Sequence, residues 1–178
     1  SKVVIMGDAA PGTTTTFSRM LDMPAMGGTN NIAFHAYLAA TGDNAANNRG
    51  DGIWKGVAPA AINTYTLVIR CGDTGVAGLP GGAKVGNLWT PWMSNANHLA
   101  FRGWVDVDGN GTSGNGTDVH GLYTDASGTM TMVIKQGDAA PGMPVGATMV
   151  NMDLPVIGGV EQMAFIGTVT GGGTTSAN

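Results

Sequence analysis

Gly7-Asp8-Ala9-Ala10-Pro11-Gly12 returns without change at residues 137–142, which places two identical hexapeptides 130 positions apart. A shortened form, Gly72-Asp73, stands midway, so the aspartates recur at intervals of 65 residues. Glycine, aspartate and proline are residues that turns favour, and each copy follows an apolar, strand-like run. The spacing predicts a repeating structural unit of about 65 residues. Its turn residues are Asp8, Asp73 and Asp138.

The hexapeptide also has the glycine spacing of a phosphate-binding loop, whose pattern is G-x-x-x-x-G-K-[ST]. The lysine of that pattern is missing, because Thr13 occupies its place. Pro11 removes a backbone N–H group that would face a phosphate, and no helical period follows. These departures exclude a phosphate loop and leave a turn as the interpretation.

Two further sets of residues repeat in the same register. A proline precedes an apolar triplet by eight residues in all three copies: Pro24 before Ile32-Ala33-Phe34, Pro91 before Leu99-Ala100-Phe101, and Pro155 before Met163-Ala164-Phe165. A second triplet appears as Gly52-Ile53-Trp54 and Gly121-Leu122-Tyr123. Together they predict about four strands in each unit and little or no helix. In the middle unit we expect strands at residues 87–93, 98–105, 120–124 and 130–136.

The strand that ends each unit is apolar on both faces, with Val68 beside Ile69 and Val133 beside Ile134. This pattern is typical of a strand covered on both sides. We therefore predict an all-β fold of antiparallel four-stranded repeats that resemble β-propeller blades, with a stacked-sheet sandwich or solenoid as the alternative.

The repeat register divides residues 1–178, a single repeat domain, into four parts. They are a partial unit at 1–8, units at 9–73 and 74–138, and a partial unit at 139–178. An unpaired sheet edge is a template for another chain. We therefore expect the protein to assemble with itself through its incomplete end units, as a closed oligomer or an open fibre.

These repeated segments resemble a bacterial tandem-repeat family named for its NxxGxxAF motif. The resemblance covers essentially the whole chain. It implies a secreted, often surface-anchored protein that has no assigned activity. Where the family has Asn and Gly before Ala-Phe, this chain has Gly27 and Asn30, Ser94 and Asn97, and Gly158 and Glu161. We therefore expect the hairpin before that strand to differ from the family's.

The composition excludes several classes of protein. Lys and Arg number only eight, and the net charge is −4, so no basic patch for nucleic acid is expected. No apolar run reaches the roughly 18 residues of a membrane span. The chain opens directly into a strand-like run, which is typical of a mature or trimmed product. Low charge and many Gly, Thr and Asn residues favour an extracellular or cell-surface location.

The clearest candidate site is a run of oxygen-bearing side chains. Asp106, Asp108 and Asn110 alternate before a glycine, which matches the first half of a D-x-[DN]-x-[DN]-G calcium loop. Calcium takes six to eight oxygen ligands, and such spacing turns them toward one point. The Glu of the EF-hand is replaced by Thr117. The predicted ligands are Asp106, Asp108, Asn110, Thr112 and Asp118. A solvated hairpin loop without metal is the open alternative.

The same loop carries two N-glycosylation sequons, at Asn110 and Asn115. Trp54 and Tyr123 occupy one repeat position and are predicted to be packing residues. Trp89 and Trp92 have no aromatic counterpart in the repeat. They are therefore our candidates for contacts with a glycan or another protein.

Catalytic motifs are absent from the sequence. The histidines, His35, His98 and His120, stand at three different repeat positions, and no HExxH, GxSxG or CxxC motif occurs. The leading hypothesis is a non-enzymatic extracellular structural protein, a fibre, sheath or matrix component. The alternative is a calcium-stabilised carbohydrate-binding or adhesion module. A glycan-active hydrolase or lyase would need a pair of carboxylates across a cleft.

Overall fold

The computed structural model describes residues 4–41, 50–58, 64–111, 113–159 and 161–173. Thirteen strands and no helix form within these ranges. Within the same segments, no helix is long and apolar enough to cross a membrane. The predicted all-β fold is thus confirmed, and the strands pair antiparallel in several sheets.

The first sheet is a four-stranded meander in the order β1-β2-β3-β4. Its strands are β1 (Phe17–Met26), β2 (Asn31–Leu38), β3 (Asp51–Val57) and β4 (Thr66–Arg70). The second sheet repeats this order as β5-β7-β8-β9, and β6 adds to the edge beside β7. Its strands are β5 (Lys84–Leu88), β6 (Trp92–Met93), β7 (Leu99–Asp106), β8 (Val119–Thr124) and β9 (Thr131–Lys135).

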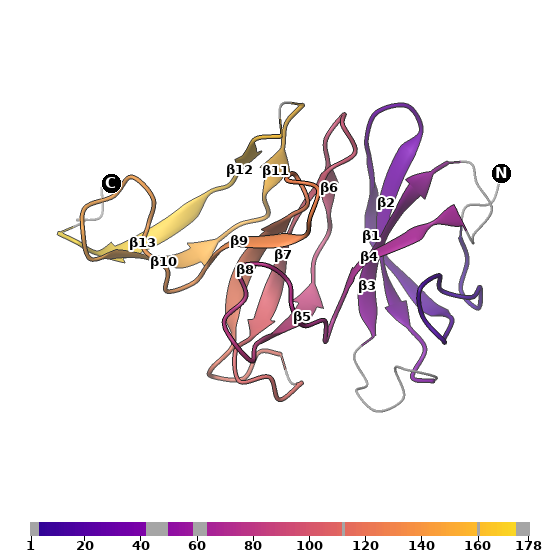
Figure 1. Cartoon of the computed structure of the whole chain (residues 1–178), viewed down its shortest axis with the longest axis horizontal. Coiled ribbons are helices and arrows are strands. Elements are labelled where there is room, and N and C mark those ends of the chain that lie inside the picture. Colours follow the sequence, from indigo (N-terminus) through magenta and orange to yellow (C-terminus); the bar gives the residue numbers. More distant parts are fainter. Residues whose placement is uncertain (1–3, 42–49, 59–63, 112, 160, 174–178) are drawn as a thin grey trace.

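The third layer consists of two short antiparallel ladders. One pairs β10 (Ala147–Met152) with β13 (Gly167–Gly171), and the other pairs β11 (Val156–Ile157) with β12 (Met163–Ala164). In Figure 1 the first sheet lies near the N-terminus, the second sheet stands beside it, and the third layer extends on the other side of the second sheet. The three layers therefore follow the three copies of the sequence repeat in order along the molecule.

One joint recurs where each layer begins. The backbone N–H of the repeated glycine donates to the first strand of the next layer, and that strand donates back to the carbonyl oxygen of the aspartate. The first set of bonds is Gly7 to Phe17 (2.8 Å), Gly72 to Val85 (2.7 Å) and Gly137 to Met149 (2.9 Å). The return bonds are each 2.9 Å, from Phe17 to Asp8, Val85 to Asp73 and Met149 to Asp138.

The side chain of each repeated aspartate closes the turn that the sequence predicts. Its Oδ2 accepts the N–H three residues earlier: Ile5 for Asp8 (3.0 Å), Arg70 for Asp73 (2.7 Å) and Lys135 for Asp138 (2.9 Å). The preceding glycine has a left-handed φ at every copy, +92° at Gly72, which residues with a side chain rarely adopt. The Gly-Asp pair therefore ends one strand and turns the chain into the next layer.

The hairpin before each Ala-Phe strand shares two features in all three copies. Asn30, Asn97 and Glu161 each adopt a left-handed φ, between 62° and 69°. The residue three positions earlier donates its N–H across the hairpin in every copy: Gly27 to Asn31, Ser94 to His98, and Gly158 to Gln162. Adjacent hairpins also touch, since a side chain on Gly28 would collide with the carbonyl oxygen of Asn95.

Two details of the predicted strands were wrong. The single strand expected at residues 87–93 is two strands, because β5 ends at Leu88 and β6 starts at Trp92. Pro91 lies in the gap, and it has no N–H for the ladder. The face assignment of the last strand also fails at Val133, which is 51% exposed. The pairing shifts between Leu122 and Tyr123, and such a bulge sends the neighbours of Val133 to opposite faces.

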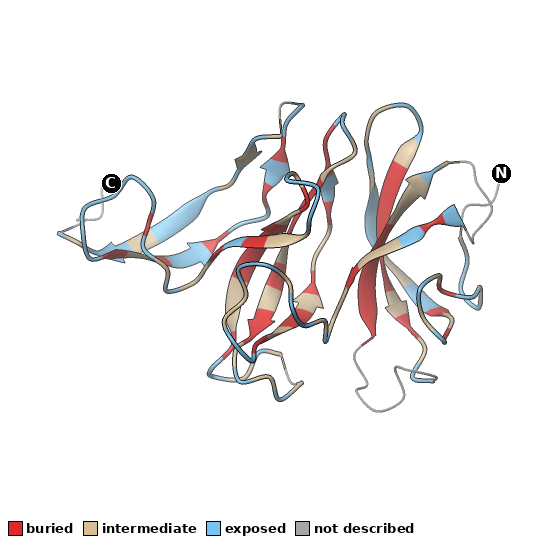
Figure 2. Ribbon diagram, viewed as in Figure 1, coloured by how far each residue is buried: buried red, intermediate tan, exposed pale blue. Residues whose placement is uncertain are grey.

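The core consists of three apolar clusters, one at each of the two layer boundaries and one on the outer side of the first sheet. Figure 2 shows that the buried residues are concentrated in the first and second sheets. Between the two large sheets, Ile53 and Ile69 of the first sheet pack with Phe101 and Tyr123 of the second. The rings of Phe101 and Tyr123 stack with centroids 5.4 Å apart. Leu122 and Ile134 make the corresponding contact with the third layer, beside Met149. The same aliphatic positions of one layer thus cover the next layer at both boundaries.

Candidate functional site

The acidic loop, residues 106–118, joins β7 to β8 at one end of the second sheet. Asp106 is the last residue of β7, and Asp118 directly precedes β8, so the hairpin brings the two carboxylates together. Both side chains are buried, at 1% and 8% exposure, whereas Asp108 between them is exposed. One oxygen atom from each of these three aspartates lies within 4.8 Å of the others.

Backbone N–H groups of the loop hold the three carboxylates in place. Gly111 donates to Asp106 Oδ2 at 2.8 Å, and Val107 donates to Asp118 Oδ1 at 3.3 Å. Asp108 accepts the N–H of Asn110 at 3.2 Å. These bonds are typical of an Asx-rich loop, and they fix the side chains through backbone donors.

The electrostatics of the loop differ between its buried and exposed carboxylates. Burial raises the pKa of Asp106, and although the Gly111 N–H lowers it, the negative charges of Asp108 and Asp118 raise it further. The N–H of Asn110 is the main cause that lowers the pKa of Asp108. Asp106 Oδ1 is buried and has no hydrogen-bond partner. Within the described ranges, no lysine, arginine or histidine forms an ion pair with these carboxylates.

The other predicted ligands lie around this triad in different ways. Asn110 directs its side-chain Nδ2 at Asp108 Oδ2, 2.8 Å away. Thr112 lies outside the described residues. Thr117 was not predicted as a ligand, yet its Oγ1 lies 3.1 Å from Asp108 Oδ2. Of the sequon residues, Asn110 is exposed and Asn115 is half-buried, and Asn115 Oδ1 accepts the N–H of Thr117 at 3.0 Å.

Trp89 belongs to a cluster of rings on the second sheet. The Arg102 guanidinium lies 5.0 Å from the centroid of the Trp89 ring, and the ring of His120 lies 4.0 Å from that of Trp104. Arg102 Nη2 is 2.6 Å from His120 Nδ1. Burial, followed by the charge of Arg102, lowers the pKa of His120 to about 4, so the ring is neutral and accepts this hydrogen bond. All four side chains are half-buried, so the cluster is partly open to solvent.

Trp92 lies apart from that cluster. It pairs with Ala100 across the sheet and is 49% exposed. The corresponding strand positions in the other layers are Ala25 and Val156, which pair with Ala33 and Ala164 in the same way. Trp92 therefore stands on the sheet face that points toward the third layer.

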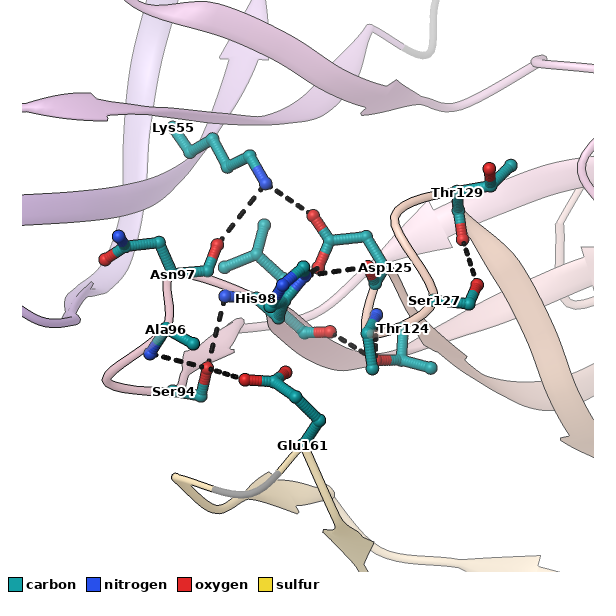
Figure 3. Close-up of polar contacts among 12 residues, drawn as sticks. Lys55, Ser94, Ala96, Asn97, His98, Thr124, Asp125, Ser127, Thr129 and Glu161 are labelled. Carbon is teal, nitrogen blue, oxygen red and sulfur yellow. Dashed lines mark hydrogen bonds and ion pairs between the residues drawn. The ribbon is translucent and has the colours of Figure 1, made fainter.

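A polar network that sequence patterns did not reveal connects the layers (Figure 3). Lys55 Nζ of β3 donates to Asp125 Oδ2 at 2.5 Å, and Asp125 Oδ1 accepts the N–H of Leu99. On the other side of the second sheet, Ser94 Oγ donates to Glu161 Oε1 at 3.2 Å. Isolated polar residues carry these contacts, one on β3 and three in loops, and they have no periodicity that a sequence could display.

A second buried network joins the first two sheets. His35 Nε2 lies 2.9 Å from Asp51 Oδ2, and that oxygen accepts the N–H of Leu88 from the second sheet at 2.8 Å. His35 and Asp51 are 3% and 1% exposed. At the corresponding positions of the second sheet stand Arg102 and His120. His35 is therefore buried at the boundary between the first and second sheets.

The fold and this site define an all-β repeat protein of layered antiparallel sheets with an acidic loop on its second layer. The chain belongs to a family of unknown function, DUF7453, whose model matches residues 1–178. No curated protein and no solved structure matches the chain.

Proposed function

We propose that this protein is a non-enzymatic, extracellular structural repeat module that assembles with itself into a fibre, sheath or matrix. The observation that carries the proposal is the open outer face of the third layer. Positions that the next layer covers in the first and second sheets are exposed there. Such chains would extend the stack if the third layer of one chain packs against the first sheet of the next chain.

At one repeat position, the side chain becomes more exposed from the first layer to the third. His35 of the first sheet is 3% exposed beneath the second sheet, Arg102 of the second is half-buried, and Ile166 of the third layer is 75% exposed. Val150 and Val156 of the same layer are also exposed, at 40% and 44%. Apolar side chains gathered on one open face favour a protein partner.

The opposite end of the stack offers a complementary surface. A cavity of about 190 Å³ opens on the first sheet, lined by Val4, Met20, Leu21, Asp22, Pro24, Ile32 and Phe34. In the second sheet the positions of Ile32 and Phe34 are held by Leu99 and Phe101, which pack against Ile53 of the preceding layer. The cavity on the first sheet therefore occupies the position that corresponds to Ile53 at the boundary between the first and second sheets.

The layers support a description as blades of a propeller-like or solenoid-like stack. The first sheet is a four-stranded meander, the second repeats this order with β6 added beside β7, and the joint between layers is the same at Asp73 and Asp138. A head-to-tail contact repeated with a constant rotation closes into a ring or continues as a filament. We favour the filament.

The test is the state of the purified chain across a concentration series. Light scattering after size exclusion should show mass rising with concentration, and negative-stain images should show rods or rings built from units of one size. A chain that stays monomeric at the highest concentration, with no ordered particle in the images, would contradict the proposal.

The half-open ring cluster favours a second candidate, a carbohydrate-binding or adhesion module. Trp89 and Trp104, beside Arg102, present aromatic faces and a cation on one surface. Sugars stack on such rings. Glycan-array binding that Trp89→Ala removes and Trp92→Ala preserves would support this candidate, and an array without signal would exclude it for the glycans displayed.

A further inference from the structure

The acidic loop concentrates negative charge, and within the described residues no basic side chain forms an ion pair with it. Asp106, Asp108 and Asp118 each place an oxygen within 4.8 Å of the others. Lys84 is the neighbour of Asp106 across the β5–β7 ladder, yet the two form no ion pair within the described residues. A cluster of this kind is stable when a cation or protons neutralise it.

Asp106 provides an independent observation. Its side chain is 1% exposed, and its Oδ1 has no hydrogen-bond donor. Buried polar atoms in proteins nearly always have a partner, because an unpartnered one carries the full cost of desolvation. The other oxygen of the same carboxylate is satisfied by Gly111. An oxygen without a donor, on a carboxylate that belongs to this cluster, is available to bind a cation.

We propose that Asp106, Asp108 and Asp118 bind one calcium ion and thereby fasten the β7–β8 loop. The three carboxylates offer up to six oxygen atoms, and Ca²⁺ takes six to eight oxygen ligands from carboxylates, carbonyl groups and water. An oxygen that accepts one N–H keeps a second lone pair for a metal. Oxygen-only ligands suit a hard cation and do not suit zinc or copper.

The surrounding contacts support Ca²⁺ over Mg²⁺. The ligands come from an irregular loop and both ends of a hairpin, and Asp108 is exposed on the solvent side. Mg²⁺ needs a near-ideal octahedron and retains most of its water, whereas Ca²⁺ accepts irregular geometry. Three carboxylates without the bidentate Glu of an EF-hand predict weak binding, with a Kd of about 10⁻⁴–10⁻³ M. This inference does not depend on the proposed self-assembly.

Trp104 supplies an internal reporter for the site. Its ring atom Cζ2 lies 3.8 Å from the position that a Cβ on Gly114 would take, so the ring lies against the loop. Terbium(III) binds to calcium sites and luminesces when a nearby tryptophan is excited. Titration of the whole chain with Tb³⁺, excited through tryptophan, should give saturable emission that excess Ca²⁺ abolishes.

Variants make the test specific. Asp108→Asn keeps an exposed side chain of the same size and should weaken Ca²⁺ binding at least tenfold by isothermal titration calorimetry. Asp138→Asn is the matched control, because it removes the same charge from a half-exposed aspartate in the turn after β9 that is not one of the three ligands, and it should change the affinity little. Circular dichroism confirms that each variant is folded.

The outcomes separate clearly. Saturable Tb³⁺ emission, its displacement by Ca²⁺ and its loss in Asp108→Asn alone support the site. Emission that does not saturate, or that Asp108→Asn and Asp138→Asn reduce equally, overturns it. Displacement by Mg²⁺ at the same concentration as Ca²⁺ overturns the assignment to calcium.

Discussion

Lys55 Nζ lies 2.5 Å from Asp125 Oδ2, an ion pair between the first sheet and the loop that follows β8 of the second (Figure 3). Asp125 is 9% exposed in its side chain, and its other oxygen accepts the N–H of Leu99. Asp125→Ala should therefore lower the free energy of unfolding by about 2–4 kcal/mol, because it removes the ion pair with Lys55 and leaves the buried N–H of Leu99 without its acceptor. Urea unfolding measures the loss.

Replacing the lysine of the same ion pair should lower the free energy of unfolding by less. In Lys55→Met the carboxylate keeps its bond from Leu99 and the nearby His98 ring, and the methionine retains the apolar stem, so we expect a loss of about 1–2 kcal/mol, below that of Asp125→Ala. A larger loss for Lys55→Met than for Asp125→Ala would contradict the assignment of Asp125 as the centre of the network.

Trp54 anchors the first turn of the chain to the first sheet. Its side chain is fully buried, and its Nε1–H donates to the carbonyl oxygen of Pro11 at 2.9 Å. Trp54→Ala should cost about 3–5 kcal/mol in unfolding free energy through the cavity and the lost bond. Trp92→Ala is the matched control. Because Trp92 is 49% exposed, its removal should cost about 1 kcal/mol or less, and equal losses would refute the burial assigned to Trp54.

Asp73 tests the joint between layers. Asp73→Ala removes the acceptor of the Arg70 N–H and should cost about 1 kcal/mol. Asp73→Asn keeps an oxygen at that position and should be nearly neutral. If thermal melts show equal losses for the two variants, the carbonyl-like acceptor is not what holds the turn.

The lowered pKa of His120 should make the stability of the protein depend on pH. The folded state lowers the pKa of His120 to about 4 from an ordinary value of 6.5, so the unfolded chain binds a proton there that the folded chain does not. The contribution of His120 to stability is therefore complete above pH 6.5 and falls as the pH is lowered toward 4. His120→Gln should have a shallower decline of Tm across this range. Parallel curves for wild type and variant would rule out this linkage.

The repeat and the positions of most strands could be predicted because they rest on local chemistry. Glycine and aspartate impose a turn at Asp8, Asp73 and Asp138, and the repeated triplets that begin at Ile32 and Leu99 lie in β2 and β7. The bulge at Val133 escaped prediction, since an extra residue in a strand leaves no mark in a pattern of period two. The split between Leu88 and Trp92 was also missed, although Pro91 was a usable signal.

The acidic loop was predictable in part. The alternation of Asp106, Asp108 and Asn110 indicated that their oxygen atoms face one point. Asp118 lies near Asp106 and Asp108 because the hairpin returns the chain to the same end of the sheet. The hydrogen bond from Thr117 to Asp108 depends on loop conformation and could not be predicted from spacing. Contacts between layers, such as Lys55 with Asp125, join residues far apart in sequence and depend on how the sheets stack.

The central claim is that the open face of the third layer joins chains together. Sedimentation velocity of Ile166→Asp beside Val145→Asp tests it most directly, because both side chains are exposed but Val145 stands on a turn before β10. We predict that Ile166→Asp abolishes the concentration-dependent increase in sedimentation coefficient and that Val145→Asp preserves it. Assembly that survives Ile166→Asp, or a wild-type chain that sediments as a monomer throughout, would contradict the account.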